Sequence, residues 1–252
     1  MRFREFGSKK NETIILLHGG GLSWWNYRTE AELLQSDYHI VLPVLDGHAG
    51  SDRTFTSIES NAEELIEYID ANCGGRVLMI GGLSLGAQIL LEVLSQRSDI
   101  CRYAIVESAS VIPSKTLNML IGSTFGVFYG LIKNKLFAKL QFRSLHIKQD
   151  LFEDYYRDTC KITKEDYIAF LKANTAYSLK KTIADTTACV HVIAGDKETG
   201  VIKRSADMIR NSIADCKVIT LPDLFHGEFS LNYPDRYVEF IKQCLIRNTG
   251  DN

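Results

Sequence analysis

Two hydrophobic patterns alternate along this chain. Short apolar runs, typical of strands buried on both faces of a sheet, occur at 13–17, 39–45, 76–80, 102–106, 190–194 and 216–222. Between most of them lie longer segments in which apolar residues recur every three or four positions, as on one face of a helix. This alternation predicts an α/β fold with a mostly parallel, doubly wound sheet and helices on both faces. Residues 3–6 predict an additional edge strand.

The alternation stops between about 111 and 181. The pattern there is helical, because Leu131, Ile132, Leu136 and Leu140 recur at helical spacing. Thr-Lys-Glu-Asp at 163–166 is a capping box, which predicts the start of another helix. We therefore expect a core formed by 1–110 and 182–252, and a helical cap formed by the insertion 111–181.

Glycine-rich turns follow two of the predicted strands. Gly-Leu-Ser-Leu-Gly at 82–86 joins a strand to a helix, an arrangement that exposes the hydroxyl of Ser84 above the sheet. The helix start leaves the N–H of Leu85 without a helical partner. Another strand runs into His-Gly-Gly-Gly at 18–21, whose backbone N–H groups are open to a substrate oxygen. These turns predict that Ser84 is a nucleophile and that the amides of Leu85 and Gly20 form an oxyanion hole. Gly21 is the second choice for an oxyanion donor.

An acid and a histidine follow two later strands. Asp196 comes after the strand at 190–194, and His226 lies in the loop after the strand at 216–222. Because the carboxyl ends of parallel strands meet at one edge, we expect Ser84, Asp196 and His226 to lie together. Glu107, at the end of the strand at 102–106, is the rival for the acid. Asp223 is interpreted as a turn residue that faces away from His226.

Taken together, these segments resemble the α/β-hydrolase superfamily over residues 13–245, apart from the insertion. The resemblance implies that the insertion, placed after the sixth strand of the family, is a cap over the serine. The loop at 46–51 resembles the family's Pro-Gly-His-Gly-x-Ser segment, but Asp46 replaces the proline and Ala49 replaces a glycine. His48 in this loop is interpreted as structural.

The resemblance also implies a reaction class. A serine nucleophile distinguishes the chain from the dehalogenases and epoxide hydrolases of this fold, which use aspartate, and Glu228 does not match the lysine of hydroxynitrile lyases. Hydrolysis of an ester, thioester or amide through an acyl-serine remains. The apolar cap favours a carboxylic ester or thioester with an apolar acyl group. Two alternatives stay open: carbon–carbon bond hydrolysis, although Leu22 replaces that group's usual proline, and a non-catalytic ligand-binding protein.

Composition and the absence of certain motifs limit the partners, compartment and cofactors expected for this chain. The 252 residues are 45% hydrophobic, which supports a large core, and the net charge of −2 gives no reason to expect nucleic-acid binding. Residues 1–10 lack the apolar stretch of a signal peptide, and no apolar run is long enough for stable membrane insertion. The six cysteines form no Cys-x-x-Cys pair, which indicates reduced thiols in the cytoplasm. Neither metal-ligand spacing nor a phosphate loop occurs, so we expect no metal or cofactor. The expected partner is a small-molecule acyl substrate. The sequence leaves the oligomeric state open.

The predicted cap has an unusual charge distribution. From Lys115 to Lys148 it carries six basic residues and no aspartate or glutamate, with apolar residues between them. Such a segment is interpreted in three ways: a solvated basic face over a core-facing apolar stripe, a surface that attracts an anionic substrate or acyl carrier, or a membrane-surface helix.

Overall fold

A seven-stranded sheet forms the centre of the molecule, in the order β1-β3-β2-β4-β5-β6-β7. The computed structural model describes residues 1–246, and in 125–128 it describes the helix but not the side chains. The end of the expected core, 247–252, lies outside the described residues. The strands are β1 (Arg2–Phe6), β2 (Thr13–Leu17), β3 (His39–Val44), β4 (Val77–Leu83), β5 (Cys101–Glu107), β6 (Cys189–Gly195) and β7 (Cys216–Leu221). Only β1, the expected edge strand, is antiparallel to its neighbour among these strands.

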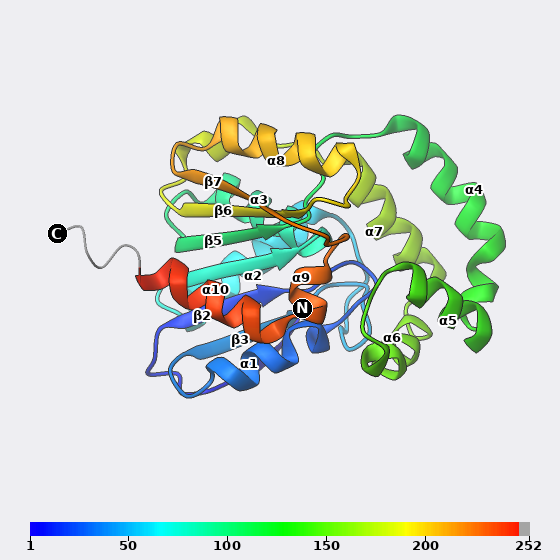
Figure 1. Ribbon diagram of the computed structural model, residues 1–252, viewed down its shortest axis with the longest axis horizontal. Helices are drawn as coiled ribbons and strands as arrows, with labels where there is room; N and C mark the ends of the chain where they lie inside the picture. Colours follow the sequence, from blue (N-terminus) through cyan, green and yellow to red (C-terminus); the bar gives the residue numbers. More distant parts are fainter. Residues whose placement is uncertain (247–252) are drawn as a thin grey trace.

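Helices cover both faces of this sheet, as the alternating pattern predicted (Figure 1). Those of the core are α1 (Arg28–Leu34), α2 (Ile58–Asn72), α3 (Leu85–Gln96), α8 (Gly200–Ser212), α9 (Glu228–Asn232) and α10 (Pro234–Ile246). Short 3-10 helices occur at Trp24–Tyr27, Gln149–Leu151 and Lys181–Asp185. The predicted α/β-hydrolase fold is confirmed.

The strand pleat explains why the core has two layers. Successive side chains of β2 point to opposite faces of the sheet. Ile15 and Leu17 join the apolar cluster beneath α2 and α3, whereas Ile14 and Leu16 join the cluster beneath α1 and α10. A strand buried on both sides in this way has to be apolar throughout, as the sequence of β2 is.

Four helices, which lie between β5 and β6 in the sequence, extend beyond the end of the sheet on the right in Figure 1. They are α4 (Lys115–Ile132), α5 (Lys135–Ser144), α6 (Phe152–Thr159) and α7 (Lys164–Ala176). The boundaries of a cap at 111 and 181 stay a prediction. None of the described helices is long and apolar enough to cross a membrane.

The apolar stripe expected over 131–140 is not one core-facing stripe. Asn134 interrupts it, because its side chain accepts hydrogen bonds from the first amides of α5 and so begins a new helix. Ile132, at the end of α4, is buried, but Leu136 and Leu140 on α5 are exposed. Leu136 and Leu140 therefore do not fit the first of the three interpretations, a basic face over a core-facing apolar stripe.

The capping box at α7 is present, with one difference. Thr163 Oγ1 accepts a hydrogen bond from the N–H of Asp166 at 3.1 Å. The Asp166 carboxylate, however, also accepts a hydrogen bond from the N–H of Phe55 at 2.7 Å. Asp166, the last residue of the capping box, thus ties the start of α7 to the loop that holds Phe55.

Candidate active site

Ser84 occupies a strained turn between β4 and α3. Its φ of 52° and ψ of −108° lie in a region that residues with a side chain rarely adopt. The N–H of Ser84 donates to the carbonyl of Glu107 at 2.9 Å, and its carbonyl accepts from the N–H of Gln88 at 3.0 Å. The two contacts hold the turn from both sides, and the Ser84 side chain remains partly exposed.

The two glycines around Ser84 are required by close backbone approach. A Cβ on Gly82 would lie 2.5 Å from the carbonyl oxygen of Gly86, and a Cβ on Gly86 would lie 2.3 Å from the carbonyl oxygen of Leu17. Neither contact is possible for a carbon atom. The Gly-x-Ser-x-Gly pattern is therefore a packing requirement of a helix that leaves the sheet at so sharp an angle.

His226 reaches Ser84 from the loop after β7. Its Nε2 lies 3.0 Å from Ser84 Oγ, and its Nδ1 lies 2.8 Å from Oε2 of Glu198. The histidine side chain is 50% exposed, whereas that of Glu198 is 0% exposed. Serine, histidine and carboxylate thus form a continuous chain of hydrogen bonds that runs from the surface into the protein.

The prediction that Asp196 is the acid partner of His226 is wrong. The Asp196 carboxylate accepts a hydrogen bond from the N–H of Asp223 at 2.7 Å. Asp196 lies in a tight turn after β6, closed by a hydrogen bond from the N–H of Glu198 to the carbonyl of Gly195. This turn directs Asp196 toward the neighbouring loop and brings the acid two positions later to the histidine.

Glu198 is held as a carboxylate by several donors. Its Oε1 accepts hydrogen bonds from Ser108 Oγ at 2.8 Å and from the N–H of Gly195 at 2.9 Å. Burial acts to raise the pKa of Glu198, but the hydrogen bond and charge of His226, together with these two donors, outweigh burial and hold the pKa below its usual value.

Ser108 contacts the buried carboxylate of Glu198, and no motif in the sequence points to it. It follows β5 with a φ of 56°, and its hydroxyl oxygen also accepts the N–H of Gly227 at 3.2 Å. One side chain therefore connects the acid to the residue that follows the histidine. A serine with a positive φ directly after a strand is a signal that only the structure provides.

Neither rival acid is hydrogen-bonded to the histidine within the described residues. Glu107 is buried, and its Oε1 accepts the N–H of Ser230 at 3.2 Å. Burial raises the pKa of Glu107 to about 7. Asp223 is exposed in a turn and pairs with Lys197 at 3.2 Å, as its interpretation as a turn residue predicted.

The loop after β2 meets the start of α3. A Cβ built on Gly20 would lie 3.5 Å from Cβ of Leu85, so these two residues are in contact. Within the described residues, neither amide donates to another protein group. The N–H of Gly21, by contrast, donates to Nε2 of His48 at 3.0 Å. The amides of Gly20 and Leu85 are thus available to a ligand, whereas the amide of Gly21, the second choice in the sequence prediction, is engaged by His48.

His48 and His18 are buried parts of the scaffold around this loop. The Nδ1 of His48 is bonded to the carbonyl of Asp46 at 3.0 Å, so the ring bridges two loops. Burial lowers the pKa of His48 to about 4 and holds that of His18 well below its usual value. Both rings are therefore neutral near pH 7, which suits hydrogen bonding within the core.

Helix α7 covers the oxyanion loop. Cε2 of Phe170 would lie 3.3 Å from a Cβ on Gly20, and the Phe170 ring stacks on His48 at 4.7 Å. Gln88 of α3 fixes α7 in place, because it donates to the carbonyl of Asn174 at 3.0 Å and accepts from the Asn174 amide at 2.9 Å. A buried aromatic side chain on a helix tied to the core thus covers the loop at 18–21.

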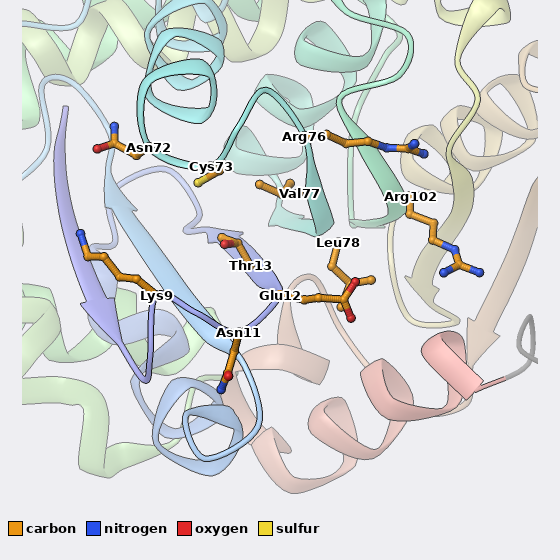
Figure 2. A pocket seen from close by; sticks show the side chains of 10 residues that line it. All are labelled: Lys9, Asn11, Glu12, Thr13, Asn72, Cys73, Arg76, Val77, Leu78 and Arg102. Atoms are coloured by element: carbon orange, nitrogen blue, oxygen red, sulfur yellow. The ribbon is translucent and has the colours of Figure 1, made fainter.

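A polar pocket of about 630 Å³ lies at the opposite edge of the sheet, where β2 and β4 begin (Figure 2). Its charged lining residues are Lys9, Glu12, Arg76 and Arg102. Ligands of open α/β sheets bind at the carboxyl ends of the strands, and this pocket is at the amino ends. Within the described residues, no group of three His, Cys, Asp or Glu is arranged to hold a metal ion.

Comparison with known proteins identifies the family. The sequence model of the alpha/beta hydrolase family matches residues 14–240. The chain belongs to this family. No curated protein sequence matches it.

Solved structures of alpha/beta hydrolases share the fold at low sequence identity. A thermophilic esterase from Thermogutta terrifontis has a TM-score of 0.79 and 16% identity, over 97% of this chain and 92% of that chain. An enol-lactonase from Burkholderia xenovorans has a TM-score of 0.79 and 14% identity, over 97% of this chain and 95% of that chain. An esterase from a Rhodococcus species has a TM-score of 0.74 and 16% identity, over 96% and 93%.

Proposed function

We propose that this alpha/beta hydrolase cleaves a carboxylic ester or thioester through an acyl-serine intermediate, with Ser84, His226 and Glu198 as its triad. One observation carries the proposal: a strained, partly exposed serine is hydrogen-bonded to a histidine whose other nitrogen is bonded to a fully buried carboxylate. A serine hydroxyl is a poor nucleophile near pH 7 and needs such a base.

In the first half of the reaction, Ser84 Oγ bonds to the carbonyl carbon as Nε2 of His226 takes the hydroxyl proton. The Glu198 carboxylate accepts a hydrogen bond from Nδ1–H of His226. This bond fixes the tautomer of the ring and stabilises the imidazolium. The amides of Gly20 and Leu85 stabilise the oxyanion, and the loss of one such donor typically costs about 3 kcal/mol. Collapse of the intermediate breaks the bond to the leaving oxygen or sulfur, which receives the proton from His226.

The second half regenerates the enzyme. Water attacks the acyl carbon and gives a proton to His226, and the bond to Ser84 Oγ breaks as that proton returns to the serine. The products are a carboxylic acid and an alcohol or thiol. The contact of Phe170 with the oxyanion loop supports an apolar acyl group, because an aromatic ring there stabilises apolar surface more than charge.

Labelling with a fluorophosphonate tests the nucleophile. The unmodified chain is expected to be labelled, Ser84→Ala is expected to lose the label, and Ser212→Ala, which changes a partly exposed serine on α8, is expected to keep it. A series of p-nitrophenyl esters and matching thioesters of increasing acyl length then defines the substrate. A folded chain that is neither labelled nor active on any member of the series would overturn the proposal and favour a ligand-binding role.

A further inference from the structure

Helix α5 exposes two leucines directly opposite its buried face. Ala138 and Phe142 pack inward, whereas Leu136 is 77% exposed and Leu140 is 65% exposed. Lys139 and Arg143 share the outward side, since 136, 139, 140 and 143 follow the i, i+3, i+4, i+7 spacing of one helix face. We refer to Leu136, Lys139, Leu140 and Arg143 as the outer stripe.

Helix α4 adds further exposed apolar side chains near its N-terminus. Met119 is 80% exposed, and Leu117 and Leu120 are also exposed. Figure 1 places α4 and α5 on the outer side of the cap, farthest from the sheet. Single exposed leucines are common on protein surfaces, but the paired leucines of the outer stripe, together with the exposed apolar residues at the far end of α4, give the outer side of these helices an unusually apolar character.

The same segment is strongly basic. Six lysines and arginines and no acidic residue occur between 115 and 148, although the whole chain carries a net charge of −2. Lys135 pairs with Glu153 at 2.9 Å. For Lys139 and Arg143, no carboxylate lies within ion-pair distance in the part of the chain that the structure describes. The positive charge of the outer stripe is therefore not neutralised by the protein itself.

We propose that α4 and α5 form a peripheral docking surface for an anionic phospholipid membrane. The outer-stripe leucines would enter the boundary between headgroups and acyl chains, and the basic side chains beside them would contact lipid phosphates. Side chains that project from a convex helix fit such a soft boundary, which requires no complementary pocket. The charge pattern selects an anionic surface over a neutral one.

Vesicle co-sedimentation of the full chain tests this proposal. Binding is expected to vesicles of equal parts phosphatidylglycerol and phosphatidylcholine, and to weaken strongly when the ionic strength is raised to about 0.5 M. Pure phosphatidylcholine vesicles are expected to bind far less. Equal binding to both vesicles, or no binding to either, would overturn the proposal.

Matched variants assign the binding to the outer stripe. The double variants Leu136→Ser/Leu140→Ser and Lys139→Glu/Arg143→Glu are each expected to weaken vesicle binding at least about tenfold. The control is Leu33→Ser/Met208→Ser, which changes two exposed apolar residues on α1 and α8, away from the outer stripe. It is expected to bind vesicles as the unmodified chain does. Circular dichroism and the melting temperature show whether each variant is folded.

A second copy of the chain is the competing occupant of this surface. If light scattering shows a dimer that Leu136→Ser/Leu140→Ser converts to a monomer, while vesicles bind neither form, the surface is a self-association interface and the membrane proposal fails. Because vesicle binding needs no turnover, Ser84→Ala is expected to bind vesicles as the unmodified chain does. The outcome is therefore independent of the proposed ester hydrolysis.

Discussion

Two buried glutamates lie at the ends of neighbouring strands, and they differ in how many hydrogen-bond donors surround the carboxylate. Glu198, after β6, has both oxygens bonded, to His226, Ser108 and Gly195. Glu107, at the end of β5, has one bonded oxygen, and its Oε2 has no hydrogen-bond partner within the described residues. The pKa of Glu198 lies below its usual value, and burial raises that of Glu107 to about 7. Burial alone therefore does not decide the charge of a carboxyl, because the donors around it do.

The largest expected effect follows from replacing the well-bonded glutamate. Glu198→Gln is expected to lower kcat/KM on an active ester about 10³- to 10⁴-fold, because an amide does not hold the tautomer that His226 needs. Asp196→Asn is the matched control and is expected to stay within a few-fold of the unmodified chain. The opposite ranking of these two variants would return the acid role to Asp196.

A smaller loss is expected when Glu198 keeps its charge but loses one donor. Ser108→Ala removes the hydroxyl that bonds both Glu198 and the N–H of Gly227. A buried hydrogen bond to a charged group is worth about 1.5–3 kcal/mol, so kcat is expected to fall about 10- to 100-fold. The acid limb of the kcat–pH profile is expected to move to higher pH. Ser95→Ala, on α3, is expected to leave both readouts unchanged, and a Ser108→Ala profile identical to that of the unmodified chain would contradict the assigned role.

Glu107 is expected to affect stability rather than activity. Because its folded pKa is about 7 and its unfolded pKa is near 4.5, the unfolded chain releases its proton first as pH rises. The free energy of unfolding therefore falls between about pH 4.5 and 7, by at most about 3 kcal/mol.

Glu107→Gln is expected to remove this pH dependence. Urea unfolding at pH 5 and pH 8 measures it: the variant should gain stability relative to the unmodified chain at pH 8, while its kcat/KM stays within several-fold. Glu153→Gln, on the exposed face of α6, is the control. A stability difference that does not grow with pH would show that Glu107 is ionised when folded.

Asp223 is expected to give the smallest effect, although it lies only three positions before His226. Asp223→Asn removes an exposed ion pair with Lys197, and such pairs are worth about 0–1 kcal/mol. Steady-state kinetics and thermal melting should both stay close to the unmodified values. A loss of activity comparable to that of Glu198→Gln would place Asp223 in the triad.

The sequence predicted the fold because β2 to β6 are almost entirely buried, and α2, α8 and α10 each have one apolar face. The turn that carries Ser84 was predicted because it requires glycines that can be recognised in the sequence. The proximity of His226 to Ser84 followed from the expectation that the carboxyl ends of parallel strands meet at one edge. The choice between Asp196 and Glu198 depends on the direction of a turn of two residues after β6, and no apolar pattern encodes that direction. Ser108 and the exposed leucines of α5 were missed because hydrogen-bond partners and helix-face burial depend on contacts between distant segments.

The bond between Gln88 and Asn174 has a consequence for changing the substrate range. Since α3 begins directly after Ser84, the proposed nucleophile, and also binds α7 through Gln88, we expect Phe170 to move together with Ser84. We therefore expect α7 to behave as part of the rigid core, and substrate entry to depend on movement of the outer helices instead. Substitutions at Phe170 are then expected to change the space available to the acyl chain without changing the movement that admits the substrate.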